Sequence, residues 1–314
     1  MSLEILCIGQ LVTDIIATNI DYTHLGEDTK RADEITVKNG GDCMNVAIDL
    51  AKLGCKVGFS GKVGNDGFGE FLRSEFDKLQ IDTRGLRVSD DVSTSSVIVL
   101  VNGQGQRIFL YYGGANDSLC VEDIDFSVMD EYRHVHIGGT FLLPRLDGEG
   151  SKEIFAAAKK RGLTTSMDVT WDTTGRWLSV IEPCLPYLDL FMPSKAEAEL
   201  ITGCAEPQQI AAFLRARGVG VAVIKLGEKG AYVESKDLRF HQPAFAVDVV
   251  DTTGAGDSFV AGFLSQYVMG RPLRECARFA AGTAAHCIGR LGATSGIPDA
   301  GAVFDFIKSS DGLE

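Results

Sequence analysis

Residues 249–263 read VVDTTGAGDSFVAGF, and this stretch carries the strongest structural signal in the chain. The apolar run from Phe259 continues to Met269 and stops at Gly270, so a helix is predicted to begin near Asp257. Small residues before the helix let the backbone approach a ligand, and the free N–H groups of its first turn would point toward that ligand. Because the helix dipole adds positive charge there, the stretch predicts a binding site for an anion such as a phosphoryl group.

Asp257 stands in the first turn of this predicted helix, and it has two interpretations. As a helix cap, its carboxylate would only accept hydrogen bonds from free N–H groups. As a catalytic base, it would take the proton from a hydroxyl that attacks a phosphoryl group at the anion site. The segment alone favours the cap, so the choice depends on the rest of the sequence.

Short β-branched segments alternate with helix-like segments along most of the chain. The predicted strands cover residues 4–9, 56–61, 134–138, 164–168, 188–192 and 221–226, and the predicted helices cover 45–53, 69–79, 150–161, 195–202 and 208–217. Several of these helices stop at a glycine, the usual helix end. The alternation predicts an α/β fold in three layers, a mainly parallel sheet with helices on both faces.

Two strand-rich segments interrupt this alternation. The second of them contains a predicted hairpin around Asn102-Gly103, between strands rich in β-branched and aromatic residues. We expect residues 15–40 and 93–116 to form a small β-sheet lid, and residues 1–14, 41–92 and 117–314 to form the α/β core. Because the apolar faces of such a lid need cover, a homodimer through the lid is expected.

Composition excludes several classes of protein. The 314 residues carry a net charge of −13, which argues against a nucleic-acid partner. No apolar run is long enough to span a membrane, and the N-terminus shows no secretory signal. The eight cysteines are scattered without a C-x-x-C pair, which indicates a reducing compartment rather than disulfides or a zinc site. We therefore expect a cytoplasmic protein.

Four segments in order resemble the motifs of the ribokinase-like, or phosphofructokinase-B (pfkB), carbohydrate kinases. They read NGGDCMNVA at 39–47, GKVGNDGFG at 61–69, IKLGEKG at 224–230 and DTTGAGD at 251–257. The resemblance covers nearly the whole chain and implies ATP-dependent phosphorylation of a sugar hydroxyl, with ATP and Mg²⁺ as cofactors. The resemblance therefore favours the interpretation of Asp257 as a catalytic base over its interpretation as a helix cap. A non-catalytic sugar sensor is disfavoured because this base and the glycines before it are intact.

The resemblance implies roles for the matching residues. Asp257 would be the base, and the anion hole would be Gly254, Ala255 and Gly256. The sugar would contact Asp14, Gly41, Asn45 and Asp172, and the nucleotide would contact Ser194, Lys225, Gly227 and Gly230. Glu197 would organise a Mg²⁺-bound water, although Ser194 stands where the family usually has Asn. A monovalent cation such as K⁺ would lie at Asp251, Thr253, Cys287, Arg290 and Gly292.

Simpler interpretations stand beside several of these roles. Asn45 could be a helix cap, Gly227 and Gly230 an ordinary turn between strands, and Asp172 a solvated loop carboxylate. If Asp14 and Asp172 both face the pocket, they would repel an acid and favour a neutral sugar.

Two other kinds of acceptor remain possible. The Gly-Gly-Asp-x-x-Asn form of the motif at 39–47 is similar to that of 2-keto-3-deoxygluconate kinases, which predicts an acid sugar instead. A nucleoside kinase is the other alternative, with Phe109, Tyr111 or Tyr112 of the lid against the base.

Overall fold

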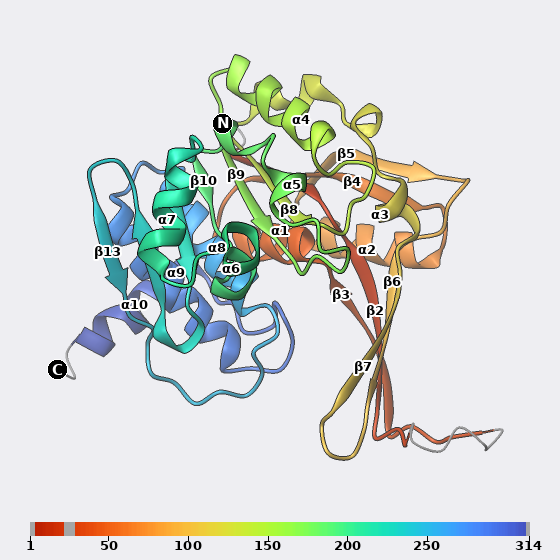
Figure 1. Ribbon diagram of the computed structural model, residues 1–314. Coiled ribbons are helices and arrows are strands. Elements are labelled where there is room, and N and C mark those ends of the chain that lie inside the picture. Colours follow the sequence, from red (N-terminus) through yellow and green to blue (C-terminus); the bar gives the residue numbers. More distant parts are fainter. Residues whose placement is uncertain (1–3, 22–28, 312–314) are drawn as a thin grey trace.

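The computed structural model describes residues 4–21 and 29–311, which form two β-sheets and the helices around them (Figure 1). The large sheet has nine strands in the order β13-β12-β11-β10-β9-β8-β1-β4-β5. Their bounds are β1 Ile5–Gly9, β4 Val57–Gly64, β5 Asp82–Ser89, β8 His134–Thr140, β9 Thr164–Val169, β10 Leu190–Phe191, β11 Val221–Lys225, β12 Ala231–Glu234 and β13 Arg239–Gln242. All neighbours pair in parallel except β11–β12 and β12–β13. The predicted α/β fold with a mainly parallel sheet is confirmed.

Alternate residues of the central strands face two different helix layers. In β1, Ile5 and Cys7 pack into one apolar cluster, whereas Leu6 and Ile8 pack into the other. Strands buried on both faces read as continuous apolar runs, as this one does. The helices are α1 Asp42–Lys52, α2 Gly67–Lys78, α3 Gly114–Ser118, α4 Glu149–Lys160, α5 Leu178–Ile181, α6 Lys195–Thr202, α7 Pro207–Ala216, α8 Ala255–Tyr267, α9 Leu273–Ile288 and α10 Ala300–Asp311. Of the helices in the described ranges, none is long and apolar enough to cross a membrane.

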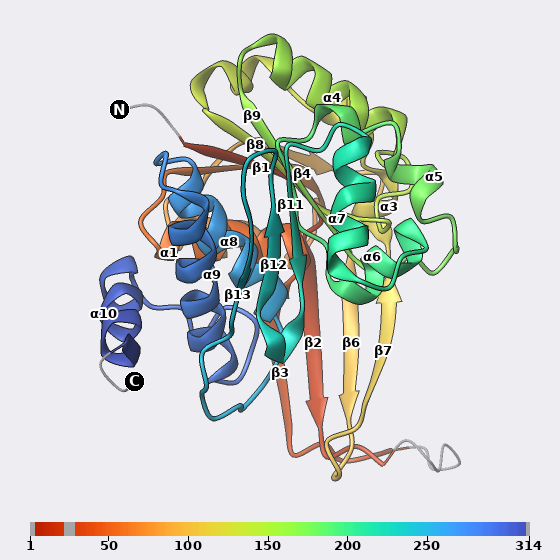
Figure 2. The same ribbon diagram turned by 60° about the vertical axis from the view of Figure 1, so that its left-hand side comes forward.

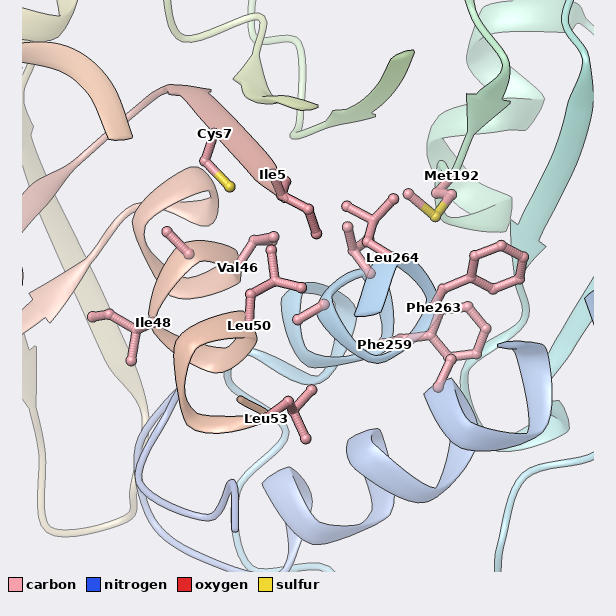
Figure 3. Packing of buried hydrophobic residues seen from close by; sticks show 14 of the residues in the cluster. Ile5, Cys7, Val46, Ile48, Leu50, Leu53, Met192, Phe259, Phe263 and Leu264 are labelled. Carbon is pink, nitrogen blue, oxygen red and sulfur yellow. The ribbon is translucent and has the colours of Figure 1, made fainter. Parts of the chain in front are cut away.

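Helices α1 and α8 lie side by side against one face of the large sheet (Figure 3). Val46 and Leu50 of α1 and Leu264 of α8 point into the apolar cluster between them. On its other side α8 packs closely against α9. The two backbones lie so near each other that a Cβ on Gly262 would be 2.8 Å from the Cα of Ala280. This packing fixes the positions of the N-termini of α1 and α8.

The small sheet has four strands in the order β3-β2-β6-β7, and it projects from one edge of the molecule (Figures 1 and 2). Its strands are β2 Val12–Thr18, β3 Glu34–Gly40, β6 Ser96–Val101 and β7 Arg107–Tyr112. The predicted hairpin around Asn102 is confirmed, since β6 and β7 pair in antiparallel fashion on either side of it. The sheet begins at Val12, slightly before the expected boundary.

Register sorts the side chains of the small sheet onto two faces, because residues paired across strands point to the same side. One face is apolar, and its rows are Ile15, Val37, Ile98 and Leu110, then Ala17, Ile35, Leu100 and Ile108. The other face carries Asp14, Lys38 and Tyr111 in one row and Arg107 farther along. This second face looks toward the loop before α8, since Arg107 donates a hydrogen bond to Thr253 in that loop.

Candidate active site

The turn before α8 has a backbone that favours glycine. Gly254 caps the helix in the left-handed region at φ 78°, and a Cβ there would lie 2.4 Å from the carbonyl oxygen of Ala293. The helix begins at Ala255, slightly earlier than predicted, so Gly256 and Asp257 belong to its first turn. The free N–H groups of that turn make a site for an anion.

The side chains of Asp257, near the N-terminus of α8, and Asn45, near the N-terminus of α1, are hydrogen-bonded to each other. The Asn45 amide donates from Nδ2 to Asp257 Oδ2 at 2.8 Å, and Asn39 Nδ2 donates to Asn45 Oδ1 at 3.3 Å. Gly41 caps α1 and Gly254 caps α8. The bond between Asn45 and Asp257 therefore joins two motifs that are far apart in the sequence.

The carboxyl group of Asp257 has a perturbed pKa. Burial raises the pKa of Asp257 well above its ordinary value, and the nearby carboxylate of Asp42 raises it further. The hydrogen bond from Asn45 acts in the opposite direction. A carboxylate of raised pKa accepts a proton more readily, as a general base needs to do.

Asp14 lies near the same helix end. Its carboxylate covers Gly40, where a Cβ would be 2.4 Å from Asp14 Oδ2. Gly41 follows at φ 89°, and its own Cβ would lie 2.9 Å from the Cα of Leu11. Burial raises the pKa of Asp14 to about 6. The structure thus gathers Asp14, Gly41 and Asn45 around the start of α1.

A cavity of about 690 Å³ extends from this point toward α9. Its polar end is lined by Asp42, Asp168, Ser194, Glu197, Lys225 and Asp257. Its other end is lined by apolar side chains that include Phe245, Val247 and Ile288. Such a division suits a ligand with phosphates at one end and an apolar ring at the other.

Gly227 and Gly230 border the cavity in the turn between β11 and β12. Both have positive φ, 60° and 85°. A Cβ on Gly230 would lie 2.0 Å from the carbonyl oxygen of Gln242, whereas Gly227 has open space around it. Gly230 is therefore required by the turn itself, and Gly227 leaves room on the cavity side.

Ser194 and Glu197 form a capping box at the start of α6. The backbone N–H of Ser194 donates to Glu197 Oε2 at 2.7 Å, and the N–H of Glu197 donates to Ser194 Oγ at 3.3 Å. The side chain of Ser194 therefore caps helix α6. Glu197 also lines the cavity.

Two carboxylates of the cavity escaped the sequence reasoning, namely Asp42 and Asp168. Asp168 accepts a hydrogen bond from Lys225 Nζ at 2.7 Å. The signal available for Asp168 was its position at the end of a predicted buried strand, where α/β proteins bind ligands. Asp42 stands inside the motif at residues 39–47, next to Gly41.

The carboxylate of Asp172 is engaged by the loop that follows it. Its carboxylate accepts hydrogen bonds from the backbone N–H of Thr174 at 2.8 Å and of Trp177 at 2.6 Å. The hydroxyl of Thr174 also donates to it at 2.6 Å. None of the four expected sugar contacts, Asp14, Gly41, Asn45 and Asp172, is among the residues that line the cavity, and the carboxylate of Asp172 also holds its own loop together.

The expected cation loop is closed by hydrogen bonds. The carboxylate of Asp251 accepts from Thr253 N and Oγ1, at 3.1 and 2.7 Å, and from Gly292 N at 3.0 Å. The thiol of Cys287 lies 3.4 Å from the carbonyl oxygen of Thr253. Arg290 is exposed, so its side chain is the least engaged of this group.

An arginine of the small sheet also reaches this loop. Arg107 Nη1 lies 3.1 Å from Thr253 Oγ1, and Nη2 lies 3.5 Å from Asp251 Oδ1. Sequence reasoning missed this contact, because it depends on how the two sheets sit together. It connects the small sheet to the turn that precedes α8.

Comparison with known proteins agrees with this geometry. A family model described as pfkB family carbohydrate kinase matches residues 2–300. A ribokinase of Staphylococcus aureus is 27% identical over 273 residues, which cover 85% of this chain and 86% of that protein. An aminoimidazole riboside kinase of Salmonella typhimurium is 31% identical over 230 residues, and 72% of each chain is covered.

Solved structures show the same fold. A ribokinase of Arabidopsis thaliana complexed with ribose and ATP is 27% identical and matches with a TM-score of 0.88, over 98% of this chain and 99% of that one. A Thermotoga maritima ribokinase is 30% identical with a TM-score of 0.83, over the same shares. The chain therefore belongs to the pfkB family of carbohydrate kinases and is an ATP-dependent kinase.

Proposed function

We propose that this kinase phosphorylates a hydroxyl of a neutral sugar and that Asp257 is its general base. The observation that carries the proposal is the 2.8 Å bond between Asn45 and Asp257. It places the residue that would contact the sugar beside the residue that would take its proton. The free N–H groups of the α8 first turn adjoin the same carboxylate.

The reaction would use these groups as follows. The acceptor hydroxyl gives its proton to Asp257, its oxygen bonds to the γ-phosphorus of ATP, and the bond from that phosphorus to the bridging oxygen of ADP breaks. The N–H groups of Ala255 and Gly256 stabilise the charge on the transferring group. The raised pKa of Asp257 favours this transfer, because the carboxylate is then a stronger base.

The cavity supports ATP and Mg²⁺ as the cofactors. Its apolar end fits the adenine ring, and the carboxylates of Glu197 and Asp42 at its polar end are oxygen ligands of the kind that Mg²⁺ prefers, directly or through water. Held by these residues, Mg²⁺ would offset the negative charge of the ATP phosphates. Among the described residues no cluster of three metal-binding side chains is found.

A neutral acceptor is favoured over an acid. Asp14, Asp42 and Asp257 would all face the substrate as carboxylates, and like charges repel. The support comes from these residues rather than from Asp172. One observation favours the acid sugar instead, since Lys38 lies opposite Asp14 in the register of β2 and β3.

A nucleoside acceptor is the other alternative. Phe109 and Tyr111 lie on the face of the small sheet that carries Asp14. Phe109 is 61% exposed, so its ring is free to stack on a base.

The small sheet would act as a lid and as the interface of a homodimer. Its inner face carries Asp14, so closure over the sugar would exclude water from the reacting hydroxyl. Its outer face exposes Ile35, Ile98 and Leu110 at 67%, 41% and 54%, an apolar surface that a second subunit could cover. A cytoplasmic location is part of the proposal, because eight free cysteines suit a reducing compartment.

Activation by K⁺ is the last part of this proposal. The carboxylate of Asp251 and the carbonyl oxygen of Thr253 lie in one loop next to the α8 turn. Both are ligands that a monovalent cation accepts. Since Arg107 already contacts this carboxylate, a cation there would have to share it with the guanidinium or displace it.

The test is a panel of acceptors with ATP and Mg²⁺, with ADP release as the measurement. Neutral aldoses and ketoses are compared with 2-keto-3-deoxygluconate and with nucleosides by kcat/KM. A neutral sugar should give the highest value. A clear preference for the acid or for a nucleoside would replace the proposed acceptor, and ADP release without any dependence on acceptor would contradict the sugar kinase itself.

A further inference from the structure

One wall of the cavity is a segment without helix or strand. Residues 243–254 connect β13 to α8, and Ala244, Phe245 and Val247 of this segment line the cavity. Among the residues that the structure describes, none forms a backbone–backbone hydrogen bond with residues 244–249. The position of this wall therefore depends on how its side chains pack.

The ring of Phe245 packs against helix α10, the last helix of the chain. Its centroid lies 5.2 Å from that of Phe306 in α10, and the two ring planes meet at 65°. This arrangement is close to the edge-to-face geometry that aromatic pairs prefer. The guanidinium carbon of Arg278 in α9 lies 5.3 Å from the same Phe245 centroid. Side chains of α9 and α10 therefore hold Phe245 in place.

Phe306 also contacts helix α9, which forms a second wall of the cavity. The ring centroids of Phe306 and His286 lie 5.0 Å apart. Four other residues of α9 line the cavity, namely Ala281, Ala284, Ala285 and Ile288. None of the described residues of α10 lines the cavity itself. Phe306 thus lies outside the cavity and connects the segment before α8 to α9.

Helix α10 is fixed on α9 by close packing (Figure 2). Val303 and Ile307 of α10 are buried, and a Cβ on Gly282 of α9 would lie 2.9 Å from Ile307 Cγ1. Residues three and four apart share one face of a helix, so Phe306 lies on the same side of α10 as Val303 and Ile307. The packing of α10 on α9 therefore sets the position of the Phe306 ring.

We propose that Phe306 is a positioning residue for the nucleotide, because it holds Phe245 against the apolar end of the cavity. This inference rests on the proposed place of the adenine ring at that end. An apolar wall that moves away from a bound ring loses its dispersion contacts, even when the gap is small. Loss of the Phe306 ring leaves Phe245 free to move away from the cavity, whereas the polar end has no contact with α10 to lose.

Calorimetric titration with nucleotides tests this role. Phe306→Ala should weaken ATP and ADP by the same factor, about 3–10-fold, the usual contribution of an aromatic pair. Phe306→Leu, which keeps an apolar side chain there, should fall between the parent and Phe306→Ala. Phe304→Ala is the matched control, because Phe304 lies on the same helix but packs at 4.7 Å against Phe279, which does not line the cavity. Both alanine variants should lower Tm, and equal ATP affinity in the two would overturn the proposal.

A double-mutant cycle with Phe245 shows whether Phe306 acts through it. Phe245→Ala should weaken ATP at least as much as Phe306→Ala, and the double variant should be no weaker than Phe245→Ala alone. Additive losses would overturn the proposal. Unchanged ATP binding in Phe245→Ala would contradict the proposed place of the adenine ring, and the inference would fail with it. If the parent phosphorylates no acceptor, the proposed function fails, but the binding cycle still tests Phe306.

Discussion

Strands β1 and β7 are both rich in apolar residues, yet their surroundings are opposite. Every residue of β1 is buried, whereas every residue of β7 is exposed. Burial of a large apolar side chain contributes about 1.5–3 kcal/mol, so β1 and its neighbours stabilise the fold while β7 adds little in the single chain. The large sheet and the helices packed on it therefore fix the positions of the candidate catalytic residues. The small sheet keeps exposed apolar side chains, which under the proposed function would contact the substrate or a second subunit.

If this division holds, changes in the large-sheet half should alter turnover, and changes in the small sheet should alter affinity and association. The largest effect is expected at Asp257. Asp257→Asn should lower kcat about 10²–10⁴-fold, because the amide cannot accept the proton, with little change in ATP affinity. Steady-state kinetics and ATP titration measure this. Asp305→Asn on the exposed surface of α10 is the control, and near-parental turnover in Asp257→Asn would leave Asp257 without a catalytic role.

The next effect is expected at the turn that carries the anion hole. Gly254→Ala should lower kcat about 10²-fold and also lower Tm, because the new Cβ meets the carbonyl oxygen of Ala293 and shifts the N–H groups. Gly270→Ala is a matched control at nearly the same φ, 75°, but with open space around it. It should show only the modest loss of stability that a positive φ imposes. Equal kcat for the two variants would contradict the role of the turn.

In the small sheet, Asp14→Ala should raise the KM for the sugar about 10–100-fold and leave ATP binding unchanged. Since burial raises the pKa of Asp14 to about 6, the carboxylate is protonated as pH falls through that value and loses its charge-assisted bonds to the sugar. The sugar KM of the parent should therefore rise below pH 6. Asp14→Asn should lack this dependence, and a KM that stays flat in the parent would contradict the assignment.

The same division explains which parts of the molecule could be predicted from the sequence. The large sheet is visible because apolar runs such as 4–9 and glycine stops repeat along the chain, and local patterns report local structure. The resemblance implied that Asn45 contacts the sugar and that Asp257 is the base, and the 2.8 Å bond between them was found only in the structure. Asp168 had a signal in its position at the end of a strand, but its bond to Lys225 joins two strands that are far apart in the sequence. Arg107 could not be found in this way, because its contacts depend on how the two sheets sit together.

The role of Asp172 as a sugar contact stays a prediction, and it illustrates a different difficulty. A lone carboxylate after a strand looks like a ligand in the sequence, but the bonds from Thr174 and Trp177 to its oxygens come from the turn that follows. Side chains that hold a loop are hard to separate from side chains that bind a substrate, because both occur at the carboxyl ends of strands.

A smaller effect on turnover is expected at the outer face of the small sheet. Leu110→Lys should convert a dimer into a monomer, since it buries a charge in the proposed interface, while kcat changes less than about threefold. Light scattering gives the mass. Phe109→Lys is the matched control on the other face, and it should keep the dimer but raise the sugar KM. A parent that is monomeric at micromolar concentration would contradict the interface.

The smallest effect is expected at Arg107, the residue that connects the two regions. Its bonds to Thr253 and Asp251 are partly exposed, and such pairs contribute about 0.2–1 kcal/mol, so Arg107→Ala should lower kcat/KM only about two- to fivefold. Arg271→Ala, which removes another exposed guanidinium, is the control.

The response to K⁺ makes this last variant informative. The guanidinium of Arg107 lies 3.5 Å from the Asp251 carboxylate that would bind the cation, so the two positive charges compete for it. Removal of Arg107 frees the carboxylate, and K⁺ should then raise kcat/KM more in Arg107→Ala than in the parent. Titration of both proteins with KCl, at ionic strength held constant with tetramethylammonium chloride, measures the difference. Equal responses would show that the contact with the small sheet and the cation act on separate groups, and the link between the two regions would then have to lie elsewhere.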